Sequence, residues 1–173
     1  MIKKYFFGVV ALGSIAVGMY NLDTISSTAE KQIVTKVSDL KPGSYKVSYD
    51  KIDSHGWRAF FSMEVAQSGE IASVKFDYDN PKGILKTQDV PYNKAMRSKN
   101  GVGPADYCPR FEKNLIIYQD PEEVDAITAA THSSNTFKDF SRLAFRAAKI
   151  GDQTPLVVIQ PEPVRLSPQG GDN

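Results

Sequence analysis

At 173 residues, with 41% hydrophobic and 24% charged residues, the chain has room for one globular domain and is too apolar to be disordered. A formal net charge of +1, without a clustered stripe of lysine and arginine, argues against a nucleic-acid-binding surface. Cys108 is the single cysteine, so no intrachain disulfide forms, and it is expected to be a partly buried apolar side chain.

The N-terminal residues indicate a membrane-targeting segment that precedes the fold. Lys3 and Lys4 are followed by an uncharged run over 5–22. Basic residues before an apolar run predict a cytoplasmic N-terminus, with the rest of the chain outside the membrane. The run has a length between a signal-peptide core and a short spanning helix, so residues 1–22 are interpreted as a signal peptide or a signal anchor. A buried core helix is the alternative, which the lack of flanking caps disfavours.

The folded part is predicted to span 40–160, after a polar stalk over 23–39. Alternation of apolar and polar side chains predicts three strands at its start, over 45–49, 59–65 and 72–78. In the third strand, one face is expected to carry Ala72, Val74, Phe76 and Tyr78, and the other Ser73, Lys75 and Asp77.

Residues 81–104 are rich in Gly, Pro, Asn and Lys, which indicates a long loop. At most a short helical piece is predicted there, over 92–97. The next helix is expected to open near Pro109 and to end at Asp120-Pro121, because the residue before a proline disfavours helix.

A final helix is predicted after Ser133 or Ser134, either of which can cap it, and Gly151 occupies the position of a C-terminal cap. A last strand is predicted over 154–160, followed by a flexible Pro/Gly-rich tail over 161–173. Strands followed by helices predict an α+β domain with a small antiparallel sheet. The apolar stripe of the final helix consists of Phe137, Phe140, Ala144 and Ala147.

The most informative segment is 124–137, VDAITAATHSSNTF. A small-residue turn, Ala129-Ala130, leads there into hydroxyl and amide side chains at the start of the predicted final helix. Helix N-termini carry unpaired backbone N–H groups and favour anions such as phosphate. The alternative interpretation is simple N-capping by Ser133 or Ser134.

DAITAAT at 125–131 resembles the attachment motif of the FMN-binding domain family, which reads Asp, two free positions, Ser or Thr, Gly, Ala, Thr. KPGSYKV at 41–47 is similar to the strand that opens that domain, and SGEIASVKFDY at 68–78 is similar to its hairpin. The resemblance covers about residues 40–151. It implies an FMN-binding type of α+β fold.

In this family a flavin transferase joins the phosphate of FMN to the last threonine of the motif through a phosphodiester. The resemblance therefore assigns attachment to Thr131, and the acidic position needed for modification to Asp125. Ala129 departs from the pattern, which has glycine there; at positive φ, alanine costs about 1 kcal/mol relative to glycine. The other residues expected at the cofactor are Thr128, Ala130, His132, Ser133 and Ser134.

The resemblance implies an extracytoplasmic electron carrier, membrane-anchored or secreted, and not an enzyme. FMN would pass electrons from a membrane donor to an external acceptor or partner reductase. The alternative is an exported, non-redox binding module of the same fold that has lost covalent flavin, which the alanine at 129 favours. Aromatic candidates to line the flavin ring are Trp57, Tyr92, Tyr107 and Phe111.

Other site chemistries find little support in the sequence. His55 and His132 are the only histidines, and no Cys-x-x-Cys-His or carboxylate cluster accompanies them, so no metal site is predicted. Ser133 follows His132 directly, but no Gly-x-Ser-x-Gly elbow is present, so no hydrolase and no catalytic residue are predicted.

Overall fold

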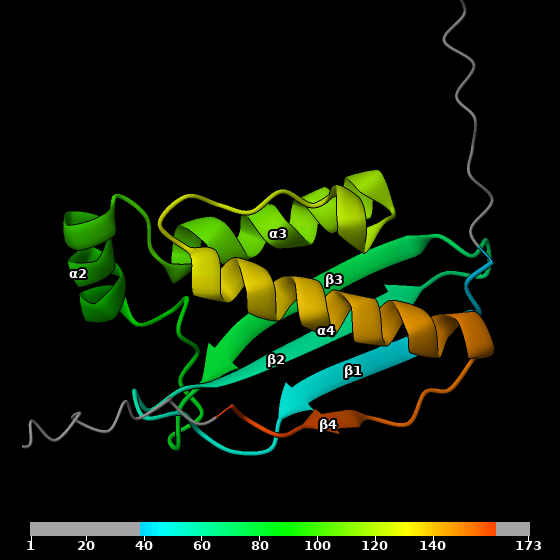
Figure 1. Ribbon diagram of the computed structural model, residues 1–173, viewed down its shortest axis with the longest axis horizontal. Coiled ribbons are helices and arrows are strands. Elements are labelled where there is room, and N and C mark those ends of the chain that lie inside the picture. Colours follow the sequence, from blue (N-terminus) through cyan, green and yellow to red (C-terminus); the bar gives the residue numbers. More distant parts are fainter. Residues whose placement is uncertain (1–38, 162–173) are drawn as a thin grey trace, which may run out of the picture. The chain divides into compact units, whose positions relative to one another are not determined.

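The computed structural model describes residues 39–161 (Figure 1). The predicted targeting segment over 1–22, the stalk up to residue 38 and the tail from residue 162 lie outside the described residues. Among residues 39–161, no helix is long and apolar enough to cross a membrane.

The sheet has four strands in the order β3-β2-β1-β4. β1 pairs antiparallel with β2, and β2 with β3, as predicted. β4 is shorter than the predicted 154–160 and runs parallel to β1, with Val47 opposite Leu156. The sheet is therefore mixed, and the prediction of an antiparallel sheet was wrong in this respect. The strands are β1 (Gly43–Tyr49), β2 (Arg58–Val65), β3 (Ile71–Asp79) and β4 (Leu156–Val158).

The parallel pairing follows from where the last helix ends. The backbone N–H of Lys41, just before β1, donates to the carbonyl of Ala148 in that helix at 2.8 Å. The chain therefore leaves the helix beside the start of β1, and Gln153 fixes this exit because its Oε1 accepts the N–H of Ser44 at 3.1 Å. From that point the chain can join the sheet edge only by running in the same direction as β1.

One face of the sheet is apolar and buried, as the alternation predicted. In β3, however, Ala72 is exposed and Ile71 is buried instead. The cause is a bulge: Glu64 pairs with Ser73 and Val65 with Ile71, so Ala72 has no partner on β2. On the N-terminal side of this bulge, the alternation of buried and exposed side chains is therefore displaced by one residue.

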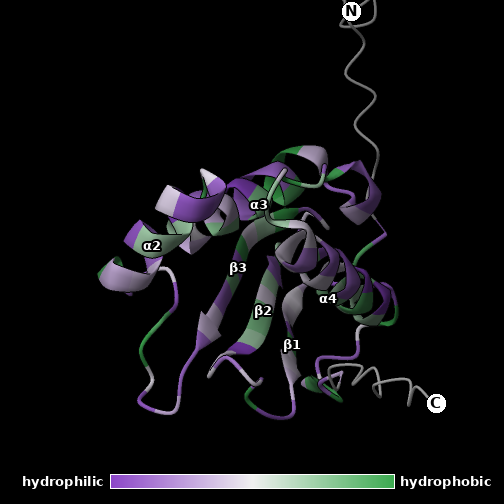
Figure 2. Cartoon of the chain, turned by 60° about the vertical axis from the view of Figure 1, so that its left-hand side comes forward, coloured by the Kyte–Doolittle hydropathy of each residue, from purple (hydrophilic) through white to green (hydrophobic). Residues whose placement is uncertain are grey.

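Two helices cover this face, and a third lies beside them at one end (Figures 1 and 2). α3 packs on β3, and α4 packs on β1 and β2. The core between the layers is aromatic; within it, Phe137 of α4 stacks on Phe111 of α3 with ring centroids 5.0 Å apart. The helical segments are α2 (Val90–Asn100), α3 (Pro104–Tyr118), the 3-10 turn η2 (Pro121–Glu123) and α4 (Thr131–Ile150).

The region predicted as a long loop contains the eleven-residue helix α2. Its ends follow ordinary capping rules: the Asp89 side chain accepts the N–H of Tyr92 at 2.9 Å, and Gly101 ends the helix at φ 77°. Asn93 is the single buried residue of α2, and it is polar. The sequence of α2 therefore has no apolar stripe at helical spacing, and a search for such periodicity does not find this helix.

α3 begins five residues before the predicted start at Pro109. Pro104 takes the first helical position, where a proline fits without loss of a hydrogen bond. The carboxylate of Asp106 accepts the N–H of Gly103 at 2.9 Å and stabilises this start. Pro109 lies inside the helix and is exposed. The prediction that the helix starts near Pro109 was therefore wrong, because Pro104 marks the start.

Candidate functional site

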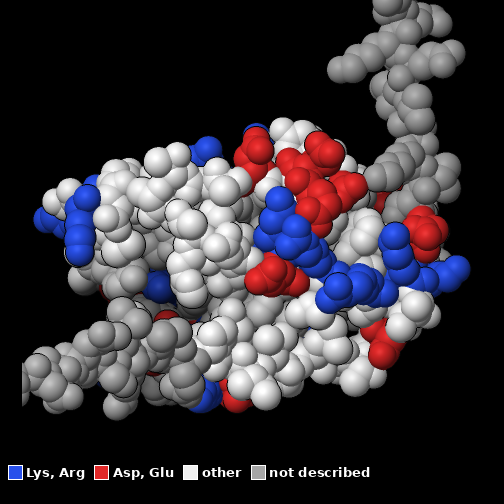
Figure 3. Space-filling model, in the orientation of Figure 1, with Lys and Arg blue, Asp and Glu red and all other residues white. Residues whose placement is uncertain are grey.

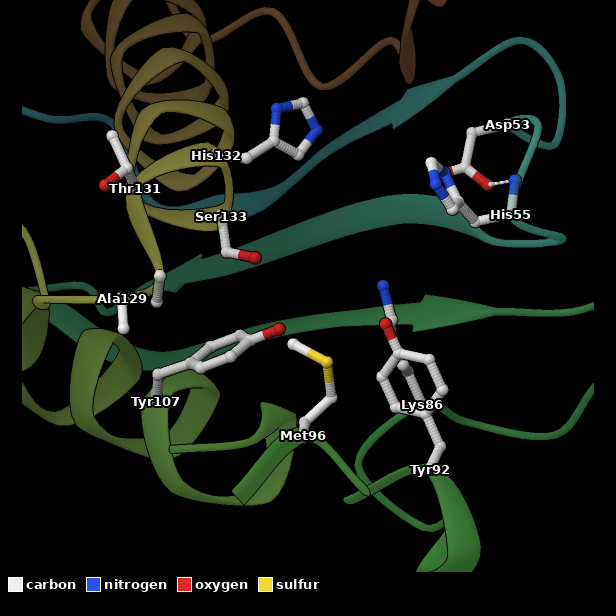
Figure 4. A pocket seen from close by; sticks show the side chains of 11 residues that line it. Asp53, His55, Lys86, Tyr92, Met96, Tyr107, Ala129, Thr131, His132 and Ser133 are labelled. Carbon is white, nitrogen blue, oxygen red and sulfur yellow. Dashed lines mark hydrogen bonds and ion pairs between the residues drawn. The ribbon is translucent and has the colours of Figure 1, made fainter. Parts of the chain in front are cut away.

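A pocket of about 360 Å³ lies at the end of the sheet where α4 begins (Figure 4). Side chains reach it from the loop between β1 and β2, from the segment between β3 and α2, and from α2, α3 and the start of α4. Its volume falls in the range of small-molecule sites. Its walls consist of residues 129–133 together with Asp53, His55, Lys86, Tyr92, Met96 and Tyr107.

The turn that enters α4 forms one wall of the pocket. The N–H of Ala130 donates to the carbonyl of Ile127 at 3.0 Å, which closes a four-residue turn. Ala129 is the third residue of this turn and has φ 63°, the position and sign for which type II turns favour glycine. The backbone at this position is therefore left-handed, a conformation that alanine adopts at a cost of about 1 kcal/mol.

Ser134 stabilises this turn and does not line the pocket. Its buried hydroxyl donates to the carbonyl of Ala130 at 2.9 Å and accepts the N–H of Ile127 at 3.1 Å. α4 itself begins at Thr131 with Ala130 as its cap, and no side chain caps it. The prediction that Ser133 or Ser134 caps the helix was therefore wrong, because the helix starts before both of them.

Thr131 is the first residue of α4; it is exposed and borders the pocket. The first backbone N–H groups of an α-helix have no partner within the helix, so the wall at 131–133 presents donors and the positive end of the helix dipole. His132 is also exposed and borders the pocket. The charged side chains of α4 and η2 gather instead toward the middle and C-terminal part of the helix (Figure 3).

Ser133 connects α4 to the aromatic side of the pocket. Its buried hydroxyl accepts a hydrogen bond from the Tyr78 hydroxyl at 2.9 Å. Burial raises the pKa of both Tyr78 and Tyr107, although the Ser133 hydroxyl works in the opposite direction on each. Both phenols therefore stay protonated at neutral pH and act as neutral hydrogen-bonding groups.

Lys86 contributes the positive charge of the pocket. The side chain is 8% exposed, and its Nζ lies 4.3 Å from the ring centroid of Tyr78, 5.1 Å from that of Tyr92 and 5.4 Å from that of Trp57. Aromatic faces attract ammonium groups in this range. Desolvation lowers the pKa of Lys86. The carboxylate of Asp53 acts in the opposite direction and raises this pKa more than any other group does.

Two buried polar residues hold the segment that carries Lys86. Asp77, fully buried at the end of β3, accepts the Thr87 hydroxyl at 2.5 Å and the Thr87 N–H at 3.2 Å. The Asn93 side chain donates to the carbonyls of Lys86 at 2.9 Å, Thr87 at 3.2 Å and Asp89 at 2.8 Å. The sequence predicted Asp77 on the solvent face of its strand, and its burial is explained by these bonds.

The loop opposite is organised by Asp53. Its Oδ1 accepts the N–H of His55 at 2.8 Å and that of Trp57 at 2.9 Å. This arrangement places the exposed His55 at the pocket and directs Trp57 into the core, where it meets Tyr92 edge-on at 5.6 Å. Among the described residues, no group of three or more His, Cys, Asp or Glu is placed to hold a metal ion.

The structure brings only some of the predicted site residues together. Asp125 and Thr128 are exposed outside the pocket lining. Of the aromatic candidates, Tyr92 and Tyr107 line the pocket, whereas Trp57 and Phe111 belong to the core. At the pocket are Ala129, Ala130, Thr131, His132 and Ser133, and outside it are Asp125, Thr128 and Ser134.

Sequence reasoning missed Lys86, Asp53, His55 and Met96 as pocket residues. Lys86 lies in a segment rich in glycine and proline, where a lysine is normally solvated. The flanking Leu85 and Thr87 gave no periodic signal, because the segment forms only an isolated bridge, between Leu85 and Asp79. No local pattern in the sequence identifies such a residue.

The fold and the pocket define a small α+β domain with a polar helix start and aromatic side chains around one cavity. No family model matches the chain. The chain is 36% identical to CPE2226 protein from Clostridium perfringens, with a TM-score of 0.66, over 70% of this chain and 99% of that one. It belongs to the same family as this clostridial protein.

A second relative is the 15 kDa lipoprotein of Treponema pallidum (strain Nichols). It is 29% identical to the chain over 120 residues, which are 69% of this chain and 84% of that protein. Neither name states a ligand or an activity.

Proposed function

We propose that the chain is an extracytoplasmic electron-transfer protein that carries FMN on Thr131 through a phosphodiester. The observation that carries the proposal is the position of Thr131: the last residue of the DAITAAT motif is exposed, begins α4 and borders a pocket with aromatic walls. A tether suits a carrier outside the cell, where a dissociating cofactor is lost by dilution.

The residues present fit the cofactor in three respects. The pocket, at about 360 Å³, has the size of small-molecule sites. Tyr92 and Tyr107 offer aromatic surface for a planar ring system. A phosphodiester on Thr131 would place its one negative charge at the N-terminus of α4, which favours anions. FMN, when bound, supplies the redox chemistry, and the protein supplies orientation and electrostatics.

The backbone conformation of residue 129, and not its side chain, supports this proposal. Glycine in the family motif implies a left-handed turn before the attachment residue, and Ala129 adopts that conformation with φ 63°. The hydrogen bonds of Ser134 to both sides of the turn hold it in place. The departure from the motif is therefore compatible with the geometry that attachment needs.

The location outside the cytoplasm is part of the proposal. The basic start and the apolar run over 5–22 support export, as does the lipoprotein name of the treponemal relative. Cys108 is the single cysteine and is buried in α3, so we propose anchoring by the N-terminal run and not by a lipidated cysteine. The partners would be a flavin transferase, a membrane electron donor and an external acceptor or partner reductase.

Intact-mass measurement tests the proposal directly. The full chain is expressed once together with a flavin transferase and once without that enzyme. We expect the mass of FMN less one water on the wild type, no adduct on Thr131→Val, and an adduct on the matched control Thr154→Val, which changes an exposed threonine outside the motif and outside the pocket lining. An adduct that survives Thr131→Val refutes attachment to Thr131, and the absence of an adduct from the wild type refutes covalent attachment.

The alternative is a non-redox binding module of the same fold. The alanine at position 129 is the observation that favours it, because the family motif has glycine there. A visible absorption spectrum of the chain purified from its native membrane separates the two functions. Flavin that stays with the protein after denaturing precipitation supports the carrier, and a colourless, unmodified protein supports the module.

A further inference from the structure

Among the described residues, the Lys86 ammonium lines the pocket with no carboxylate at ion-pair distance. Among residues 39–161 none of the ion pairs within 4.0 Å involves Lys86. The two carboxylates that act on the pKa of Lys86 have other partners: Asp53 accepts backbone N–H groups of its own loop, and Asp77 accepts bonds from Thr87 and Tyr78. Three aromatic rings lie within 5.4 Å of the Lys86 Nζ, measured to their centroids.

Such a charge lowers the free energy of an anion that enters the pocket. Burial costs an ammonium part of its hydration, and aromatic faces return only about 0.5–2 kcal/mol of it. A negative charge in the pocket would interact with Lys86 across a medium of low polarity, where screening by water and salt is weak. Lys86 is therefore placed to discriminate between a neutral and a negatively charged ligand.

The position of Lys86 is fixed by its backbone. Its N–H donates to the carbonyl of Tyr78 at 2.8 Å, and its carbonyl accepts from the buried Asn93 at 2.9 Å. Figure 4 shows its side chain rising from the wall opposite the start of α4, between Tyr92 and the Ser133 side of the pocket. This wall faces the interior of the pocket, and the attachment residue Thr131 belongs to the other wall.

We infer that Lys86 sets the reduction potential of the flavin by stabilising its reduced, negatively charged form. This inference rests on the proposed function. Uptake of two electrons and one proton, from an external reductant and from water, converts the neutral oxidised ring into a reduced ring with one negative charge. The lysine stays protonated, and no bond to it forms or breaks. Because Lys86 interacts more favourably with the charged form, it raises the potential.

The aromatic surroundings favour the ring over the phosphate as the group that Lys86 meets. Tyr92 and Tyr107 line the pocket, and the ammonium lies over the face of Tyr92, so aromatic surface borders the space that Lys86 faces. A phosphate gains nothing from such surfaces, whereas a ring system stacks against them. The phosphate has donors of its own at the backbone of the first turn of α4.

The titratable groups around Lys86 and its pocket come from five segments, and each bears on the test. They are Asp53 and His55 in the loop before β2, Asp77 and Tyr78 of β3, Tyr92 of α2, Tyr107 and Cys108 of α3, and His132 of α4. Burial raises the pKa of Tyr78, Tyr92, Tyr107 and Cys108, so these groups stay neutral near pH 7.

The test compares the midpoint potential of the flavinylated wild type with those of Lys86→Met, Lys86→Arg and Lys82→Met. Lys86→Met removes the charge and keeps the length of the chain. Lys82→Met makes the same change of net charge at an exposed residue of the same connecting segment. We expect Lys86→Met to lower the equilibrium constant for two-electron reduction at least tenfold, a fall of about 30 mV. Lys82→Met should leave the midpoint potential unchanged. Lys86→Arg keeps the positive charge, so its potential should stay close to that of the wild type.

A second measurement needs only the wild type. Free reduced flavin takes up a second proton below neutral pH, and a nearby cation opposes that uptake. The potential of the wild type should therefore follow one proton per two electrons into the mildly acidic range, with a fall of about 30 mV per pH unit. Two protons per two electrons in that range would overturn the inference even if Lys86→Met does not fold.

The outcomes separate the inference from the proposed function. Intact mass is read first: a wild type without flavin overturns the proposed function, and the inference falls with it. A flavinylated wild type whose potential is the same as that of folded, flavinylated Lys86→Met overturns the inference alone. A lowered potential in Lys86→Met, with Lys82→Met unchanged, supports both.

Discussion

The two ends of α4 use the same left-handed backbone conformation with different residues. After the last turn, Gly151 has φ 79°, and its N–H donates to the carbonyl of Ala147 at 2.9 Å. Before the first turn, Ala129 has φ 63°, and no side chain caps the helix. Glycine adopts this conformation without strain and alanine does not. The C-terminal end of α4 therefore has the glycine that a left-handed position favours, and the N-terminal end at the pocket has an alanine instead.

The difference shows what holds a strained turn in place. At the pocket end, Ser134 bonds both to Ile127 and to Ala130, and Ala130 itself is buried. Residues in sparsely populated backbone regions persist where their surroundings over-determine them, and they gather at functional sites. The turn before Thr131 is held in this way by Ser134, whereas a Cβ added at Gly151 would lie near only Lys41.

The largest expected effect comes from the aromatic core that packs against the N-terminal half of α4. Phe137, two turns into α4, packs on Phe111 at 5.0 Å, Phe76 at 5.3 Å and Phe61 at 5.6 Å. Phe137→Ala should lower the free energy of unfolding by about 3–5 kcal/mol, because it leaves a cavity in the core. Denaturant unfolding measures this. The control Phe145→Ala, at a half-buried position of the same helix, should cost less than half as much.

The next largest effect concerns the hydroxyl that fixes the strained turn. Ser134→Ala leaves the N–H of Ile127 without its acceptor in a buried place, so we expect a loss of about 1–3 kcal/mol of unfolding free energy. Amide hydrogen exchange at 127–131 should accelerate more than in the rest of α4. Asn135→Ala, at the exposed neighbouring position, is the control. Equal stability of the two variants would show that Ser134 does not hold the turn.

At the opposite end of the helix, Gly151→Ala introduces the strain that Ala129 already carries. We expect it to lower the free energy of unfolding by about 1 kcal/mol. The added methyl would lie 3.4 Å from Lys41 Cγ, an ordinary contact, so the left-handed backbone is the main cause. Thermal and denaturant unfolding measure the loss. No loss would mean that the helix end rearranges, and the comparison of the two ends would fail.

The smallest effect has the opposite sign. Ala129→Gly should raise the free energy of unfolding by up to about 1 kcal/mol, because glycine adopts φ 63° without strain. It also restores the glycine of the attachment motif, so the yield of FMN adduct per unit time should not fall. The double variant Ala129→Gly, Gly151→Ala should have nearly wild-type stability, since the two sites are distant. A destabilised Ala129→Gly would contradict the role assigned to this turn.

Much of the fold follows from local patterns in the sequence. The alternation of Tyr45, Val47 and Tyr49 predicted β1, and all three side chains are buried. Gly151 was predicted as the end of α4, because its conformational preference is a property of one residue. α2 was missed because its single buried residue, Asn93, is polar. The parallel course of β4 was missed because it depends on where α4 delivers the chain, a contact more than a hundred residues apart in sequence.

The candidate site divides in the same way. The segment 129–133 was predicted because a motif is local, and the structure places it on the pocket wall. Lys86 was not predicted, since its position depends on Asp77 and Asn93, which lie nine residues before it and seven after it and bond to its segment through the fold. A sequence pattern therefore identified the segment 129–133 on the pocket wall, and only the tertiary structure identified the charge of Lys86 in the pocket.

The burial of Cys108 has a consequence for handling the protein in air. The thiol is fully buried in α3, and burial raises its pKa, so very little reactive thiolate exists at neutral pH. The folded protein should resist alkylating reagents and run as a single band on gels without reducing agent. A chain with one sulfhydryl thus keeps it out of reach of oxygen and of other thiols, which suits an oxidising environment.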